Sequence, residues 1–190
     1  MSIEKKGPWG VLARHDVYDN RWIRVTHHDV TTPAGDTGVY GKVHYKNLAI
    51  GIVPIDLEMH TFLVGQYRFP LEAYSWEIPE GGGAMGVDPL ESAARELREE
   101  TGLRAARWQK LLEADLSNSV SDERAFAFMA WDLVQGDAEP ESTEDLAIRR
   151  VPFVEAFRMV AEGEIRDALS ILSLQAVQLL HLGGRLDLGR

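Results

Sequence analysis

Three glutamates in the middle of the sequence, Glu96, Glu99 and Glu100, fall at helical spacing. Residues three and four positions apart share one face of a helix, so a helix here brings the three carboxylates together. Like charges at these spacings repel one another, and a cation between them relieves the repulsion. Ligation by oxygen alone is typical of Mg²⁺ or Mn²⁺, which leave positions for water and substrate phosphate. The pattern indicates a metal site, although an exposed helix with Arg95 paired to Glu99 is the plainer interpretation of these residues alone.

The residues that flank the glutamates carry the signals of a helix start and a helix end. Asp88 is a good N-cap, and Pro89 suits the first helical position. Gly102 suits the end of the helix. These signals predict a helix over residues 89–101. The cluster Gly81–Gly83 just upstream predicts a loop that lets the backbone approach a ligand closely.

The segment 81–103 resembles the Nudix box, G-x5-E-x7-R-E-U-x-E-E-x-G-U, where U is aliphatic. Gly81, Arg95 and Gly102 stand at their places in this pattern, and so do the three glutamates. Val87 stands where the family has its first glutamate. The resemblance implies an α+β fold, the Nudix αβα sandwich with a mixed β-sheet. It also implies hydrolysis of a nucleoside diphosphate linked to another group.

Segments outside the box are similar to the ADP-ribose and nucleotide-sugar pyrophosphatase branch of the family. They are residues 66–70, 76–82, 121–123 and 144–146. With the strands predicted before them, the resemblance runs from about residue 22 to residue 180. The resemblance implies release of a nucleoside monophosphate and a sugar phosphate.

The resemblance also assigns metal-binding roles by position. Glu96 and Glu100 are the expected metal ligands. Glu99 is expected as a catalytic residue that binds the metal or orients the water. The residue before the box glycine, Glu80, is expected to offer its main-chain carbonyl to a metal. The expected cofactor is Mg²⁺, with Mn²⁺ as the alternative.

The general base in this branch comes from an acidic loop outside the box. Residues 135–145 form such a loop, and Glu144 is the predicted catalytic base, with Glu141 and Asp145 as alternatives. For any one of these residues, a purely solubilising role in an exposed acidic loop stays open.

Three further residues are predicted to contact the substrate. Arg68 suits a diphosphate or a sugar phosphate, with a surface salt bridge as its alternative role. Trp76 suits stacking on a base, although an aromatic residue beside glycines is as often part of a core. Glu123 is predicted to approach the metals from a neighbouring loop.

Valine at position 87 removes one carboxylate from the family's pattern. If the missing carboxylate is mainly a structural partner of Arg95, Glu91 or Glu99 can replace it, since each lies four residues from Arg95. We favour this structural view because three glutamates remain on the helix. The alternative is a catalytically degenerate module that binds a nucleotide for regulation. An enzyme acting on nucleoside triphosphates or capped RNA fits the box equally well, but fits the flanking segments less well.

Hydrophobic patterning and turn residues place these groups on an α+β framework. Strands are predicted at residues 22–30, 38–45, 48–53, 61–67, 124–131 and 146–151, and helices at 89–101, 152–162 and 167–180. We divide the chain into a β-rich N-terminal extension, residues 1–46, and a Nudix hydrolase domain, residues 47–190. Members of this branch often dimerise through such an extension, so a homodimer is expected.

The amino-acid composition narrows the classes of molecule that the chain is expected to bind. The chain of 190 residues has 20 Lys and Arg against 30 Asp and Glu, a net charge of −10, which argues against binding nucleic acid or an anionic membrane. The absence of cysteine excludes disulfides and thiolate metal sites and fits a reducing cytoplasm. The first residues lack the apolar stretch of a signal peptide. We therefore expect a cytoplasmic protein whose partner is a small nucleoside-diphosphate-linked molecule.

Overall fold

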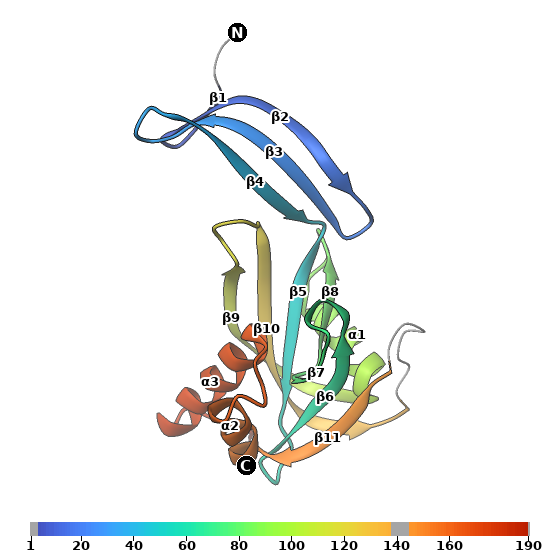
Figure 1. Ribbon diagram of the computed structural model, residues 1–190. Coiled ribbons are helices and arrows are strands. Elements are labelled where there is room, and N and C mark those ends of the chain that lie inside the picture. Colours follow the sequence, from blue (N-terminus) through green and yellow to red (C-terminus); the bar gives the residue numbers. More distant parts are fainter. Residues whose placement is uncertain (1–3, 138–144, 190) are drawn as a thin grey trace. The chain divides into compact units, whose positions relative to one another are not determined.

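The structure is a computed structural model of the chain, and it describes residues 4–137 and 145–189. The chain forms two compact units, whose elements are labelled in Figure 1. The N-terminal unit consists of Met1–Leu48 and Asp115–Arg124, and the second unit of Ala49–Ala114 and Ala125–Arg190. The N-terminal unit therefore draws on two separate stretches of the sequence.

One antiparallel sheet forms the framework of the N-terminal unit, and its described strands follow one another in chain order. They are β1 (Glu4–Lys6), β2 (Trp9–Asp19), β3 (Ile23–Thr31) and β4 (Thr37–Tyr45). The sequence predicts β3 and β4, and the structure confirms them as paired neighbours. The sequence analysis missed β1 and β2 because most of their residues are exposed, without the apolar alternation of a half-buried strand.

The hairpin at residues 115–124 belongs to the N-terminal unit because it is bound to β4. The amide of Val43 donates to the carbonyl of Val120 at 2.8 Å. The Asp122 carboxylate pairs with Lys42 at 2.6 Å and with His44 at 2.8 Å. Partial burial opposes the charged form of this carboxylate, but hydrogen bonds from these partners outweigh it and lower the pKa of Asp122 to about 2. The division drawn from the sequence at residue 46 leaves this hairpin with the second unit.

The second unit, within the described residues, holds two sheets and three α-helices. The first sheet has the order β8-β5-β10-β9, with β5 (Asn47–Pro54), β8 (Glu80–Ala84), β9 (Leu103–Leu116) and β10 (Glu123–Gln135). The second has the order β11-β6-β7, with β6 (His60–Arg68), β7 (Ala73–Glu77) and β11 (Ala147–Pro152). The helices are α1 (Pro89–Thr101), α2 (Phe153–Ala161) and α3 (Ala168–Leu182), with a short 3-10 turn, Phe69–Leu71. None of these helices is long and apolar enough to cross a membrane.

Helices cover both faces of β5, since neighbouring residues of a strand point to opposite faces. A Cβ at Gly51 would lie 3.0 Å from Leu169, which belongs to α3. On the other face, Ile50 lies against Gly83, and a Cβ at Gly83 would lie 3.3 Å from Ser92 of α1. β5 and β10 run parallel, whereas β11, β6 and β7 pair antiparallel. The predicted α+β sandwich with helices on both sides of mixed strands is confirmed.

The three predicted helices are confirmed, whereas the glycine loop is wrong. Glu80–Ala84 forms β8, which lies beside β5 at the edge of the sheet and packs against α1. The sequence analysis also missed β7 and β9. In β9 the exposed positions outnumber the buried ones and include charged residues, so pairing in the sheet decides its conformation.

Candidate active site

Helix α1 presents carboxylates on its buried face. It begins with the Asp88 carboxylate accepting the Leu90 amide at 2.9 Å, and it ends at Gly102 with φ at 73°. Glu96 is 8% exposed and Glu100 only 2% exposed. Buried carboxylates are costly unless they are paired or hydrogen-bonded. The helix is therefore not the solvated amphipathic helix of the plainer interpretation.

Arg95 joins two of the three glutamates. Its Nη1 lies 2.6 Å from Glu99, and its Nη2 lies 2.6 Å from Glu96. The same Nη2 donates to the carbonyl of Gly82 at 2.7 Å, which ties α1 to β8. Burial opposes the charge of Arg95, but the glutamates outweigh it and raise the pKa of Arg95. The guanidinium therefore stays charged and holds both carboxylates in place.

The substitution at position 87 leaves Arg95 with an acidic partner. Val87 is 41% exposed, in the turn before α1. Of the two candidates for the missing carboxylate, Glu91 and Glu99, Glu99 makes the ion pair with Arg95. This pairing agrees with a structural role for the missing residue.

Gly81 lies directly beneath the Glu96 carboxyl group. A Cβ at Gly81 would lie 2.2 Å from the Glu96 Cδ, a distance at which something must shift. Glycine is the one residue type without a Cβ, so it allows the Glu96 carboxyl group to pack against β8.

Glu80 approaches the helix glutamates through its main chain. Its amide donates to Glu100 Oε2 at 3.0 Å. Its own carboxyl group instead accepts from Arg68 Nη2 at 2.9 Å. Burial, followed by the charges of Asp167 and Glu77, raises the pKa of Glu80 well above its ordinary value, and Arg68 opposes the shift. The main-chain amide of Glu80 thus meets the Glu100 carboxylate, and the metal-binding role of the Glu80 carbonyl stays a prediction from the resemblance.

Arg68 is held by other protein groups. Its Nε lies 3.0 Å from each carboxylate oxygen of Glu77, and Glu77 is 2% exposed. Burial disfavours the guanidinium charge, but the bonds to Glu77 and the charge of Glu80 raise the pKa of Arg68. The sequence analysis missed Glu77; its only signal was a charged residue next to Ile78 at the end of a strand.

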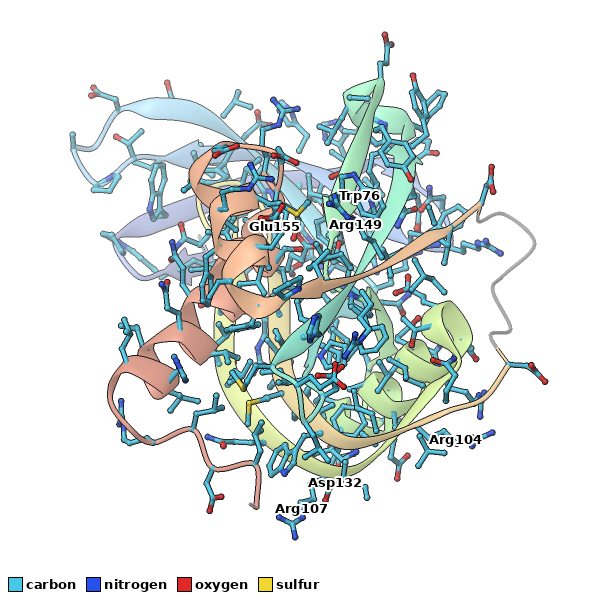
Figure 2. The ribbon with its side chains drawn as sticks, turned by 90° about the horizontal axis from the view of Figure 1, so that it is seen from below. Trp76, Arg104, Arg107, Asp132, Arg149 and Glu155 are labelled. Carbon is cyan, nitrogen blue, oxygen red and sulfur yellow. The ribbon has the colours of Figure 1, made fainter. Side chains whose placement is uncertain are left out.

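The two other predicted substrate contacts lie in different units. Trp76 is partly buried against the core of the second unit and packs edge-on to Tyr74, with ring centroids 5.6 Å apart. The Arg149 guanidinium lies 5.8 Å from its ring centroid, and Figure 2 shows the two side chains together. Glu123 begins β10 and belongs to the N-terminal unit, where its charge contributes to raising the pKa of Tyr45, after burial.

The predicted general base lies in a segment that the structure does not describe. Glu144 and Glu141 are outside the described residues, whereas Asp145 is described and exposed. Glu144 therefore stays a prediction from the resemblance.

The donor chemistry of α1 fits a hard divalent cation. Glu96, Glu99 and Glu100 offer only carboxylate oxygens, which Mg²⁺ and Mn²⁺ prefer. Across residues 4–137 and 145–189, however, no three His, Asp or Glu side chains are gathered as a ready metal cage. In this structure Arg95 pairs with both Glu96 and Glu99, and Arg98 lies 3.4 Å from Glu99.

Comparison with known proteins assigns the chain to a protein family. The profile of the NUDIX domain matches residues 45–172. The chain belongs to the Nudix family. It is a Nudix hydrolase, which confirms the prediction from the box. A second profile, the nucleoside diphosphate sugar hydrolase N-terminal domain, matches residues 9–43.

Relatives of this Nudix hydrolase cover most of its length. An ADP-ribose pyrophosphatase of Mycobacterium tuberculosis is 36% identical over 138 residues, 71% of this chain and 67% of the relative. An ADP-ribose pyrophosphatase of Bacillus subtilis is 29% identical over 180 residues, 94% of this chain and 95% of the relative. The crystal structure of an ADP compounds hydrolase superposes with a TM-score of 0.83 at 25% identity, covering 98% of this chain and all of the other.

Proposed function

We propose that this Nudix hydrolase cleaves the pyrophosphate bond of ADP-ribose or of a nucleotide sugar, releasing a nucleoside monophosphate and a sugar phosphate. The observation that carries the proposal is the buried pair Glu96 and Glu100 on α1, next to Glu99 and pressed against β8. The names of the two long relatives, and the profile matched by residues 9–43, support the substrate class.

Several residues of the chain have separate roles in the proposed reaction. Glu96 and Glu100 would hold a divalent cation, Mg²⁺ or Mn²⁺, with Glu99 and the Glu80 carbonyl as further ligands. Such a cation, when bound, supplies positive charge beside the phosphate oxygens and acidifies bound water. Arg95 keeps Glu96 and Glu99 on one side of the helix.

The hydrolysis itself is a displacement at phosphorus. The oxygen of a water molecule bonds to one phosphorus, and the bond from that phosphorus to the bridging oxygen breaks. The bridging oxygen leaves with the electron pair on the other phosphate. The proton of the water passes to a carboxylate, which we assign to Glu144, with Glu141 or Asp145 as alternatives. Trp76 and Glu123 stay candidates for contact with the substrate, as does Arg68 if its pairing with Glu77 opens.

A hydrolysis panel tests the proposal. ADP-ribose, GDP-mannose, UDP-glucose, diadenosine polyphosphates and dNTPs are each incubated with enzyme and about 5 mM Mg²⁺, in excess of typical weak binding. We expect turnover of a sugar-linked diphosphate that EDTA abolishes. Preference for dNTPs would contradict the substrate class. No turnover, with a ligand still raising the melting temperature, would instead favour the degenerate binding module.

Replacing the box glutamates tests the site. Glu99→Gln and Glu100→Gln should each lower kcat about 100-fold or more, because a neutral amide supports neither a metal nor a developing proton. Glu91→Gln is the matched control, since this glutamate is exposed in the first turn of the same helix. Circular dichroism confirms that each variant is folded. Undiminished turnover in both box variants would refute the assignment.

We further propose that the enzyme is a cytoplasmic homodimer. The N-terminal unit exposes apolar side chains that a partner subunit can cover, including Val17, Trp22 and Val39, which are 62%, 52% and 64% exposed. A chain without cysteine also needs no oxidising compartment to fold.

A further inference from the structure

The segment 77–80 runs from the last residue of β7 to the first residue of β8. It carries the main-chain carbonyl of Glu80, which is expected to bind a metal. At one end of the segment, the Glu77 carboxylate pairs with Arg68. At the other end, the Glu80 amide donates to Glu100 at 3.0 Å. The position of the Glu80 carbonyl therefore depends on how the whole segment is held, and not on α1 alone.

The middle of the segment is held from two further elements. The carbonyl of Pro79 accepts the amide of Ile52, which belongs to β5, at 2.9 Å. The amide of Ile78 donates to the hydroxyl oxygen of Ser170, which belongs to α3, at 3.0 Å. Ile78 and Ser170 are both 0% exposed. Since solvent does not reach this amide, its hydrogen bond must come from the protein, and Ser170 supplies it.

The first turn of α3 fixes the place of Ser170. The Asp167 carboxylate caps the helix by accepting the Ser170 amide at 2.6 Å. Next to Ser170, Leu169 packs over the same point of β5 as the Ile78 side chain does. A Cβ at Gly51 would lie 2.9 Å from Ile78 and 3.0 Å from Leu169. The start of α3 is therefore packed where the Ile78 side chain lies, and it also binds the Ile78 amide.

A second buried serine of α3 makes a different bond. Ser173 is also 0% exposed, and its hydroxyl donates to the carbonyl of Leu169 at 2.6 Å. This bond stays within the helix, as is common for a serine in a helix interior. The bond that Ser170 accepts leaves the helix and ends at the segment 77–80. The two serines thus share residue type, helix and burial, but differ in what their hydroxyl groups hold.

The backbone between Ser170's partner and the metal-binding carbonyl has little freedom. The ring of Pro79 fixes its φ, and the residue before a proline, here Ile78, is restricted to extended conformations. Peptide bonds are themselves planar. Few rotations therefore remain between the Ile78 amide and the Glu80 carbonyl, so a displacement of the amide also moves the carbonyl.

We infer that Ser170 is a positioning residue of the catalytic centre. By holding the Ile78 amide, it sets the place of the Glu80 carbonyl relative to the glutamates of α1. The inference rests on the proposed metal-dependent hydrolysis, and it adds a contribution from α3 that the box does not contain. Groups that orient the ligands of a metal change metal affinity or activity by about 10- to 100-fold when they are removed.

Mn²⁺ binding to the full chain tests the role without any substrate. The electron paramagnetic resonance signal of the free ion reports how much Mn²⁺ is bound. Ser170→Ala should weaken Mn²⁺ binding about tenfold, because the Ile78 amide loses its partner and the Glu80 carbonyl shifts. The kcat of the same variant at a fixed Mg²⁺ concentration should fall by a similar factor.

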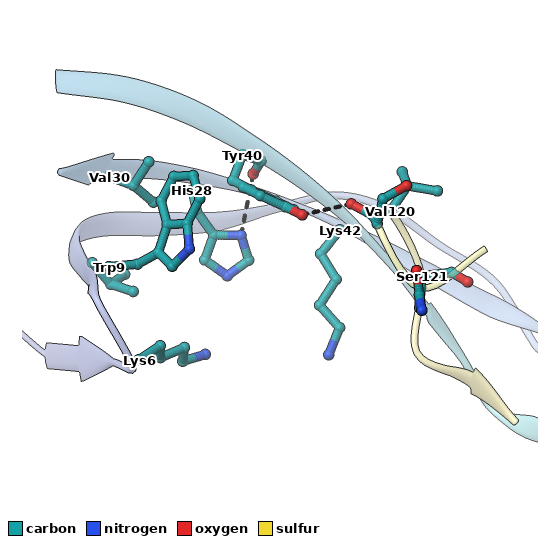
Figure 3. Close-up of a pocket in the computed structure, with 11 residues that line it drawn as sticks. Lys6, Trp9, His28, Val30, Tyr40, Lys42, Val120 and Ser121 are labelled. Carbon is teal, nitrogen blue, oxygen red and sulfur yellow. Dashed lines mark hydrogen bonds between the residues drawn. The ribbon is translucent and has the colours of Figure 1, made fainter. Parts of the chain in front are cut away.

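Three further variants separate positioning from stability and packing. Ser173→Ala removes a hydroxyl of the same helix with the same burial, and should leave Mn²⁺ affinity and kcat unchanged. Tyr40→Phe removes a hydroxyl that donates to the carbonyl of Ser119 in the N-terminal unit at 2.5 Å, a bond drawn in Figure 3, and should leave Mn²⁺ affinity unchanged. Ser170→Cys keeps most of the side-chain volume but offers a weak acceptor, so its Mn²⁺ affinity should stay reduced. It also carries the test if Ser170→Ala fails to fold.

Each outcome decides for or against the inference. Unchanged Mn²⁺ affinity in Ser170→Ala would overturn it. An equal loss in Ser173→Ala would also overturn it, because any loosening of α3 would then have the same effect. Full affinity in Ser170→Cys would assign the effect to packing and overturn the role of the hydrogen bond. If the unmodified chain binds no Mn²⁺, the proposed metal site itself is contradicted, and the inference with it.

Discussion

Arg95 keeps acidic partners although the chain lacks the family's glutamate at position 87. The family's pattern expects a glutamate at position 87, and this chain has valine there. Arg95 nevertheless bonds Glu99 and Glu96 within α1, and its bond to the carbonyl of Gly82 ties α1 to β8. The loss of one carboxylate leaves the box assembled because the remaining glutamates satisfy the same guanidinium.

The first prediction at this scale concerns Gly81. Gly81→Ala places a Cβ 2.2 Å from the Glu96 carboxyl carbon, so Glu96 must leave its position on β8. Turnover should fall at least about tenfold, since a small displacement of a positioned group is costly. Gly41→Ala is the control, because a Cβ there meets nothing within 4 Å. Unchanged kinetics in Gly81→Ala would show that the placement of Glu96 is unimportant.

The second prediction at the residue scale concerns Arg68. Arg68→Met removes the partner of Glu77, whose carboxylate is almost fully buried, and should lower the free energy of unfolding by about 3 kcal/mol. Arg158→Met breaks ion pairs that are largely exposed, and should lower the free energy of unfolding much less than Arg68→Met does. Urea unfolding measures both. A similar small loss in the two variants would mean that the Arg68 pair contributes no more than a surface ion pair.

At the scale of elements, the hairpin 115–124 is held to β4 by ion pairs in addition to main-chain hydrogen bonds at Val43. Asp122 accepts the Tyr45 amide at 3.0 Å in addition to its pairs with Lys42 and His44. The hairpin interrupts the sequence of the second unit and packs on a strand much earlier in the chain. Tyr45 and Asp122, which are hydrogen-bonded, are 77 residues apart. An element of this kind depends on a few specific contacts more than on its own apolar surface.

This attachment should depend on pH. Because the folded pKa of Asp122 is about 2, below the ordinary value near 3.9, its contribution is present above about pH 4 and is lost as the pH falls through about 2. Asp122→Asn should be less stable at pH 7 by about 1 kcal/mol, a value reduced for solvent screening, and the difference should vanish near pH 2. Asp36→Asn, in an exposed turn, should show no such difference. Urea unfolding at pH 7, 4 and 2.5 checks both variants.

At the scale of the whole molecule, the two units differ in net charge. The N-terminal unit has eight Lys and Arg and eight Asp and Glu, and the second unit has 12 against 22. The acidic charge belongs to the unit that carries the box, where a divalent cation offsets part of it when bound. The N-terminal unit is neutral overall and exposes Val17, Trp22 and Val39. A neutral surface with exposed apolar side chains favours association between chains.

The homodimer is therefore predicted to form through the N-terminal unit. Sedimentation equilibrium should give about twice the 21.3 kDa of one chain. Val17→Lys with Val39→Lys should weaken the association, because burying two ammonium groups is unfavourable. Val134→Lys, equally exposed but in the second unit, is the control. A monomeric mass for the unmodified protein would rule out the dimer.

The box helix and the acidic character of its face could be predicted from the sequence because they follow from short-range rules. Capping at Asp88, termination at Gly102 and the spacing of the glutamates act within about one to four turns of helix, and the structure confirms the helix at the predicted residues. The apolar strands β5 and β6 were predictable for the same reason, since each contains a short run of buried residues, 50–54 in β5 and 63–65 in β6.

Tertiary structure alone decided which distant groups meet. Three contacts link residues that no local sequence pattern connects. Glu96 packs against Gly81, Arg68 pairs with Glu77, and the hairpin 115–124 bonds to β4. Tertiary structure also turned the glycine segment into a strand, because packing against α1 and β5 outweighs the weak strand preference of glycine. The sequence by itself thus determined which chemical groups the protein carries and the helix that presents them. The fold determined their partners, since burial makes a carboxylate depend on whichever donor the packed chain brings near it.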